Sequence, residues 1–145
     1  MIDKVNAKSA PAKLRGSCHC GSIHYEIHGE LGPIVCCHCS QCRKSQGTAF
    51  ATNAPVKTSD FHFVSGEEDL RQFQTSPDKV RAFCQQCGSP IYSQLIKKPD
   101  VLRLRIGTLD TEIDAKPTAH IYVDSKAEWH EINDGLPQFS EREPR

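Results

Sequence analysis

Residues 36–42 read Cys36-Cys37-His38-Cys39-Ser40-Gln41-Cys42, which places four cysteines and a histidine within seven positions. Two further cysteine clusters lie at a distance on either side, Cys18-His19-Cys20 and Cys84-Gln85-Gln86-Cys87. Cysteines two residues apart in an extended strand are poorly placed for a disulfide with each other, but they can share one metal ion. The clustering therefore predicts metal binding rather than a disulfide framework.

The first and last cysteine pairs predict one closed metal site. In an extended backbone residues i and i+2 point to the same face, so Cys18 and Cys20 can reach one ion. Cys84 and Cys87 have the spacing of a turn that wraps around a metal, and Gly88 follows them directly. Four thiolates around one zinc ion leave no vacant position, so these residues are predicted to hold the fold together.

The central cluster predicts a second, open site. Cys37 and Cys39 share one strand face by the same argument, and Cys42 follows where the chain turns into a predicted helix. Cys36 and His38 should point to the opposite face and are not expected to be ligands. Three thiolates leave a zinc ion with a free fourth position, which is typical of catalytic sites.

Two alternatives remain open for the central cluster. Cys36 or a distant histidine could complete the tetrahedron, which would make both sites inert. The three thiols could also form a metal-free redox switch, for which the neighbouring Arg43 and Lys44 could lower a thiol pKa.

Outside the cysteines, short alternating segments predict a mainly β fold. Residues 22–28 alternate strictly, with Ile23, Tyr25 and Ile27 on one face. A second extended stretch begins at Ile34. Comparable segments separated by turn residues are expected at 61–64, 70–74, 79–83, 90–95, 101–106 and 119–123.

Helix signals are short and local. Ser40 could cap a turn that ends at Gln46, and a second helix could run from Asp124 or Ser125 to Glu131. Trp129 and Phe139 are expected to pack the C-terminal segment. The remaining histidines of the first strand, His24 and His28, are expected to be exposed to solvent rather than to bind metal.

Length and composition limit the class of protein. The 145 residues favour one domain, predicted over residues 14–139, with a mobile N-terminal segment at 1–13 and a C-terminal tail at 140–145. Lys plus Arg and Asp plus Glu both number 18, and the resulting net charge of zero predicts no binding of nucleic acid. No long apolar run and no signal-peptide core are present, so we expect no membrane association and a cytoplasmic location.

Three ordered motifs carry a family resemblance. They are Gly16-Ser17-Cys18-His19-Cys20-Gly21, Cys37-His38-Cys39-Ser40-Gln41-Cys42-Arg43-Lys44 and Phe83-Cys84-Gln85-Gln86-Cys87-Gly88-Ser89-Pro90, followed by Gly107-Thr108-Leu109, His120-Ile121-Tyr122-Val123 and Trp129. Over about residues 14–139 the chain resembles the glutathione-dependent formaldehyde-activating (Gfa) family, also called the centromere protein V/Gfa domain. The resemblance implies a β-rich, Mss4-like fold with short helical turns and two zinc ions per chain. It implies a structural zinc at Cys18, Cys20, Cys84 and Cys87 and a catalytic zinc at Cys37, Cys39 and Cys42, whereas Cys36 departs from the family pattern.

The resemblance also implies a function. It points to a zinc-dependent carbon–sulfur lyase or synthase that acts on a glutathione–aldehyde adduct of the S-hydroxymethylglutathione type, with glutathione as co-substrate and an aldehyde as the second small molecule. Two hypotheses of other classes stay open. The protein could be a non-catalytic carrier of glutathione or its adduct, or a zinc-stabilised protein-interaction module.

Overall fold

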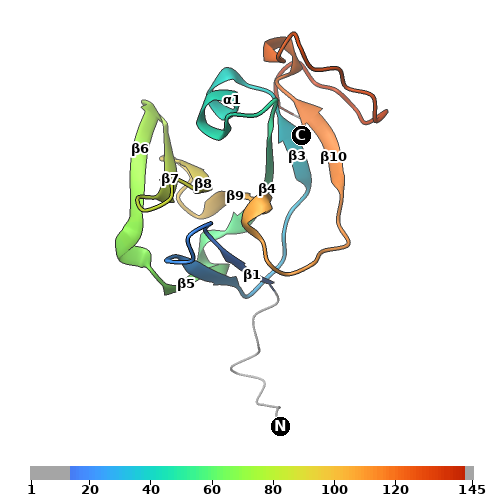
Figure 1. Cartoon of the computed structure of the whole chain (residues 1–145). Helices are drawn as coiled ribbons and strands as arrows, with labels where there is room; N and C mark the ends of the chain where they lie inside the picture. The colour runs from blue at the N-terminus through green and yellow to red at the C-terminus, as the bar shows by residue number, and fades with distance from the viewer. Residues whose placement is uncertain (1–13, 143–145) are drawn as a thin grey trace.

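Two β-sheets make up the computed structural model, which describes residues 14–142 (Figure 1). The predicted N-terminal segment 1–13 and the last residues of the predicted tail, 143–145, lie outside the described residues. The smaller sheet is antiparallel and contains β1 (Leu14–Ser17), β2 (His24–Ile27) and β5 (Phe61–Ser65) in the order β1-β2-β5. The boundaries proposed at residues 14 and 139 for the domain stay predictions.

The larger sheet has seven strands in the order β10-β3-β4-β9-β8-β7-β6. Its strands are β3 (Ile34–Cys37), β4 (Ala51–Lys57), β6 (Leu70–Ser76), β7 (Lys79–Cys84), β8 (Pro90–Leu95), β9 (Val101–Arg105) and β10 (Pro117–Ile121). Neighbours are antiparallel except β10 and β3, which run parallel. The sheet bends into an arc with β6 and β7 toward one end and β3 and β10 at the other (Figure 1).

The prediction of a mainly β fold is confirmed, and the first strand shows why. Ile23, Tyr25 and Ile27 are buried, while His24 and His28 are exposed, as the alternation predicts. The structure adds two strands that sequence reasoning missed, β1 and β4. The second of them, β4, pairs with both β3 and β9. Its Asn53 and Pro55 interrupt the apolar pattern, so no period-two signal marks it.

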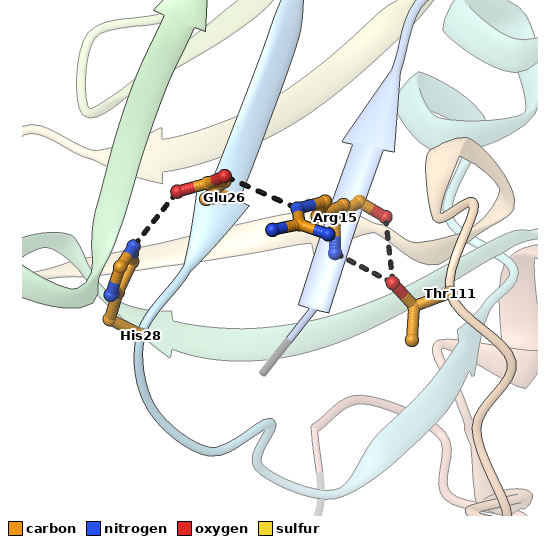
Figure 2. A network of polar contacts seen from close by, with 4 residues as sticks. All are labelled: Arg15, Glu26, His28 and Thr111. Atoms are coloured by element: carbon orange, nitrogen blue, oxygen red, sulfur yellow. Dashed lines mark hydrogen bonds and ion pairs between the residues drawn. The ribbon is translucent and has the colours of Figure 1, made fainter. Parts of the chain in front are cut away.

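The polar face of the small sheet carries the network in Figure 2. Arg15 Nε and His28 Nε2 lie 3.2 and 3.0 Å from the two carboxylate oxygens of Glu26, and the Arg15 amide donates to Thr111 Oγ1 at 2.8 Å. The pKa of Glu26 is lowered first by its hydrogen bond with His28 and then by that with Arg15. His28 is therefore part of an exposed surface network, which confirms the predicted exposure of this side chain.

Helix α1 (Ser40–Gln46) has the predicted length but a different cap. The Cys39 sulfur, rather than the Ser40 hydroxyl, accepts the Cys42 amide at 3.3 Å, and Gly47 ends the helix in the left-handed region at φ 69°. Four 3-10 turns complete the described secondary structure: η3 (Thr58–Asp60), η4 (Glu67–Asp69), η5 (Ile106–Thr108) and η6 (Val123–Ser125). Within residues 14–142, no helix has the length and apolar content needed to span a membrane.

The second predicted helix is wrong. The chain forms only η6 and then leaves helical geometry at Lys126, whose ψ is 144°. The Lys126 ammonium donates to the Ala127 carbonyl at 3.1 Å and also to the His130 carbonyl. These two hydrogen bonds stabilise the irregular loop. Trp129 in this loop is 74% exposed, which contradicts its predicted packing role.

Two apolar clusters form the core. The larger one lies against the small sheet and includes Tyr25 and Phe61, whose rings stack with centroids 4.8 Å apart. The smaller one consists of Val35, Cys37, Cys42, Ala51, Ala119 and Ile121. Phe139 packs against this second cluster, as predicted. Packing of the second cluster therefore positions two of the central cysteines.

Candidate metal centres and active site

Cys18, Cys20, Cys84 and Cys87 come together although about 64 residues of chain separate the two pairs. Their sulfur atoms all lie within 4.8 Å of one another. The Cys18 and Cys20 sulfurs are 3.6 Å apart, and those of Cys20 and Cys84 are 3.9 Å apart. A tetrahedron with metal–sulfur bonds of about 2.3 Å has edges of about 3.8 Å. The donor set and its spacing therefore fit a four-coordinate metal ion.

Both cysteine pairs lie on tight turns, which corrects the extended geometry expected for the first pair. Cys18 and Cys20 lie in the connection between β1 and β2, where Gly21 takes φ 83° and donates its amide to the Cys18 carbonyl at 3.1 Å. Cys84 ends β7, and Gly88 repeats the arrangement with φ 81° and a 2.8 Å bond to the Cys84 carbonyl. Left-handed backbone of this kind favours glycine, so each glycine permits the turn that aims a sulfur pair.

Amide and hydroxyl groups surround these sulfurs. The amides of Ile23 and Gln86 donate to the sulfurs of Cys18 and Cys84, each at 3.3 Å. The pKa of Cys87 is lowered to about 5, first by its hydrogen bond with the Ser89 hydroxyl. Donors around a sulfur favour the thiolate form, which is the form that binds metal.

The central cysteines Cys37, Cys39 and Cys42 also lie with their sulfur atoms within 4.8 Å of one another. Cys37 ends β3, Cys39 is the N-cap of α1, and Cys42 lies in the first turn of that helix. The pKa of Cys42 is lowered first by hydrogen bonds with Cys37 and Cys39, and further by nearby arginines. Because the helix begins directly after the strand, three thiols within residues 37–42 lie close together in space.

Neither Cys36 nor any histidine of the described residues joins this group. Cys36 is buried and faces the register partners Thr52 and His120 on β4 and β10. The pKa of Cys36 is raised to about 11, first by burial. A neutral buried thiol of this kind is a packing residue, so the structure offers no support for the alternative in which Cys36 completes a tetrahedron.

His38 belongs to a buried polar chain. Its Nε2 lies 2.8 Å from His120 Nδ1, and His120 Nε2 lies 2.8 Å from a carboxylate oxygen of Asp134. Because a carboxylate only accepts, His120 Nε2 donates to Asp134, and its Nδ1 shares a proton with His38 Nε2. The pKa of His38 is lowered to about 4, first by burial. His38 therefore stays neutral and fixes the backbone between two of the central cysteines.

Two buried arginines face the central thiols. Arg81 on β7 donates to the Cys42 sulfur at 3.7 Å and to Ser45 Oγ at 3.3 Å, and Arg105 on β9 donates to Gln46 Oε1 at 3.1 Å. They are 6% and 3% exposed. Both positive charges lower the pKa of Cys42 after the two neighbouring thiols.

The sequence points to Arg43 and Lys44 as the cations that could lower a thiol pKa, because they adjoin Cys42 in the chain. The two cations with the largest effect on Cys42, Arg81 and Arg105, come instead from distant strands. The sequence held a signal for one of them, Arg105. Strand β9 reads Val101-Leu102-Arg103-Leu104-Arg105, and alternation places Arg103 and Arg105 on one face of the sheet.

A cavity of about 430 Å³ lies beside the central thiols. Cys37 and Cys42 line it, together with apolar side chains that include Val35, Pro55 and Ile121. Its charged lining is entirely positive within the described residues and consists of Lys79, Lys98, Arg103 and Arg142. A volume of this order suits a small ligand, and the lining suits an anionic one.

The family comparison agrees with this geometry. The family described as "Glutathione-dependent formaldehyde-activating enzyme" matches residues 13–125. The chain belongs to this family. The match includes both cysteine groups and ends within η6, so the segment that follows, with Arg142 on the cavity wall, lies outside it.

Two curated relatives extend the comparison. An uncharacterized lyase of Schizosaccharomyces pombe is 33% identical over 81 residues, which cover 55% of this chain and 56% of the relative. A Colletotrichum graminicola protein named for glutathione-dependent formaldehyde activation is 29% identical over 103 residues, 68% of this chain and 53% of the relative. The chain thus spans about half the length of the curated relatives it matches.

The fold has a solved counterpart. The crystal structure of a Rhodobacter sphaeroides protein matches with a TM-score of 0.59 at 24% identity, and the match covers 86% of this chain and 98% of that one. At this identity the likeness concerns the fold alone.

Proposed function

We propose that this Gfa-family chain binds two zinc ions and acts as a carbon–sulfur lyase or synthase on a glutathione–aldehyde adduct of the S-hydroxymethylglutathione type. The observation that carries the proposal is the position of Cys37 and Cys42 on the wall of a cavity whose charged lining is positive. A thiol-bearing anion can enter such a cavity with its sulfur next to the proposed metal.

The two cysteine groups would hold the two ions in different ways. All-sulfur donor sets favour zinc among the common divalent ions of proteins. Cys18, Cys20, Cys84 and Cys87 form a closed set of four, which suits a structural ion. Cys37, Cys39 and Cys42 form a set of three, which leaves one position for a substrate sulfur. Zinc bound there would favour the deprotonated form of that sulfur at neutral pH.

The proposed reaction forms one carbon–sulfur bond. The sulfur of glutathione attacks the carbon of formaldehyde, the electron pair of the C=O π bond moves to oxygen, and that oxygen takes up the proton that the thiol released. The lyase direction reverses each of these steps. No oxidant or reductant is needed, and the eight cysteines, all free of disulfides, fit the reducing cytoplasm that we propose as its location.

The cavity lining gives the chain its proposed role in binding. Glutathione carries two carboxylates and one ammonium group, so the tripeptide with its thiol protonated has a net charge of −1. Lys79 and Arg103 are half-buried, and burial lowers the pKa of each. An anion that pairs with these cations offsets part of the free-energy cost of burying their charges. The wall therefore favours a carboxylate ligand. The apolar side chains of the cavity limit the access of water to the sulfur.

Arg81 and Arg105 lie where they can offset the negative charge of the proposed zinc centre. Three thiolates and one divalent ion sum to a charge of −1, which disfavours the approach of a fourth thiolate. The two buried guanidinium groups beside Cys42 offset that charge. They would make the centre more receptive to a thiolate than its ligand set alone suggests.

Replacing Arg81 by methionine tests this compensation. The substitution keeps an unbranched apolar side chain and removes the charge and the hydrogen bond to the Cys42 sulfur. We expect the zinc affinity of the central site to fall by roughly tenfold to a hundredfold, as when a group that orients a ligand is lost. Competition with a chromophoric chelator measures this zinc affinity. The exposed Arg71→Met on β6 is the control, and equal affinity in both variants would contradict the compensation.

One observation favours a second candidate function, a carrier of glutathione or its adduct. Among the described residues that line the cavity, none is a histidine or a carboxylate, which are the commonest general acids and bases. A cavity of this kind can bind a thiol without accelerating its addition to an aldehyde. The interaction-module hypothesis has no comparable observation in its favour.

Turnover as a function of pH separates the enzyme from the carrier. An unperturbed thiol has a pKa of about 8.5, so free glutathione is mostly protonated at mildly acidic to neutral pH. An enzyme that stabilises the thiolate should accelerate adduct formation most in that range. The gain should fade as free thiolate becomes abundant at higher pH, and it should vanish at low pH when the cysteine ligands take up protons and release metal.

The measurement is the rate of adduct formation with catalytic amounts of zinc-loaded protein, corrected at each pH for the spontaneous rate. Acceleration in the expected range supports the enzyme. Stoichiometric glutathione binding without turnover at any pH would leave the carrier as the function of this chain.

A further inference from the structure

The segment of residues 134–142, which we name the C-terminal strap, is hydrogen-bonded to β10 and to the residues that follow it. The Phe139 amide donates to the His120 carbonyl at 2.9 Å, and the His120 amide donates to the Pro137 carbonyl at 2.9 Å. The Tyr122 amide donates to the Glu141 carbonyl, also at 2.9 Å. These bonds run along the strap up to the residue before Arg142.

Two side-chain anchors hold the same segment. The carboxylate of Asp134 accepts from His120 Nε2 at 2.8 Å, and this bond lowers the pKa of Asp134. Phe139 packs against the core cluster that contains Cys37 and Cys42. The strap is therefore built onto the same packing unit as the central thiols.

The strap delivers Arg142 to the cavity wall, where Arg103 of β9 also lies. Burial lowers the pKa of Arg103, and the positive charge of Arg142 lowers it further. Within residues 14–142, neither guanidinium has a carboxylate at ion-pair distance. The charges of Cys37 and Cys42 oppose this lowering at Arg103, but no carboxylate among residues 14–142 separates the two guanidinium groups. An anion that binds between two such like charges relieves their repulsion.

Tyr122 adds a second observation at the same wall. Among the described residues, Tyr122 is the only residue other than glycine with a positive φ, which is 57°. A left-handed backbone is unfavourable for a tyrosine and persists only where neighbours hold it. Tyr122 lines the cavity, and the hydrogen bond from its backbone amide to the Glu141 carbonyl joins the strained residue to the strap. Backbone strain of this kind is concentrated at ligand sites.

We propose that the C-terminal strap sets substrate specificity: Arg142, together with Arg103, binds the glycyl carboxylate of glutathione. This inference rests on the proposed function, in which the cavity takes a glutathione-type thiol. The glycyl end suits two arginines because its carboxylate stands alone. The other carboxylate of glutathione adjoins an ammonium group, which a cationic wall repels.

A comparison of two ligands on matched variants tests the assignment. Glutathione and its glycyl monoethyl ester, in which only that carboxylate is masked, are titrated calorimetrically into the zinc-loaded full-length protein. We expect the unsubstituted protein to bind glutathione roughly tenfold more tightly than the ester, the usual scale for one charged hydrogen-bonded pair near the surface. Arg142→Gln should lose most of that preference through weaker glutathione binding, while its ester affinity changes less than twofold.

Two further variants complete the design. Phe139→Ala loosens the strap without touching the ligand and should lower the preference as Arg142→Gln does. Arg71→Gln, an exposed arginine on β6 away from the cavity lining, should keep the full preference.

The outcomes separate the two proposals. If the unsubstituted protein binds neither glutathione nor the ester, the proposed function itself fails. If it binds glutathione but binds the ester equally well, or if Arg142→Gln keeps the full preference, the role of the strap is overturned while the proposed function stands.

Discussion

Replacing Cys84 by serine should leave most of the protein unfolded or aggregated, without a cooperative melting transition. Cys84 is fully buried at the end of β7, and the group of four cysteines that could share a metal ion joins the seven-stranded sheet to the connection between β1 and β2 of the small sheet. Structural zinc sites contribute about 10–16 kcal/mol to folding, and the whole stability of a domain is about 5–15 kcal/mol. Loss of one ligand therefore removes a large part of what holds the two sheets together.

Circular dichroism during heating, together with zinc analysis, measures this effect. Cys36→Ser is the matched control, because Cys36 is also a buried cysteine but belongs to neither metal group. Burying one hydroxyl in its place should cost about 1–3 kcal/mol and keep both ions. A Cys84→Ser protein that melts cooperatively with its full zinc content would contradict the structural role proposed for this group.

Replacing Cys39 by serine should have the second largest effect, on function rather than on folding. The central site closes only the short segment from β3 into α1, so its loss leaves the rest of the fold intact. A serine hydroxyl can still accept the Cys42 amide, so the helix keeps its N-cap. We expect about one zinc ion per chain to be lost and glutathione affinity to fall by roughly a hundredfold, because the substrate sulfur loses its metal partner.

Zinc analysis, a melting curve and a glutathione titration on one preparation test this expectation. The Arg142→Gln variant is a useful comparison, since it should weaken glutathione binding while keeping both ions. If Cys36→Ser loses an ion and Cys39→Ser keeps both, the ligand set is shifted along the chain and the central assignment is wrong.

What the sequence alone could predict was encoded locally. The alternation of Ile23, Tyr25 and Ile27 identified a half-buried strand, since successive side chains of a strand face opposite ways. The spacing within each cysteine cluster predicted which thiols can share an ion, because cysteines two or three residues apart can bring their sulfurs together. The turn that brings Cys18 and Cys20 together was visible only in the structure. The same local motifs, read in order, were enough to place the chain in its family.

What depended on contacts between distant residues was missed. Strand β4 carries no period-two signal and exists because β3 and β9 pair with it on either side. The arginines with the largest effect on the pKa of Cys42 come from β7 and β9 and not from its neighbours in the chain, Arg43 and Lys44.

The cavity was decided by tertiary structure in the same way. Its positive wall collects Lys79, Arg103 and Arg142 from two strands and the C-terminal strap, in a chain whose net charge is zero. Net charge is a sum over the whole chain, whereas the field inside a cavity depends on which side chains the fold brings within a few ångströms of one another. Coulomb interactions fall with distance in space and not with separation along the chain, so only the folded structure shows that a neutral protein presents a cationic site beside its thiols.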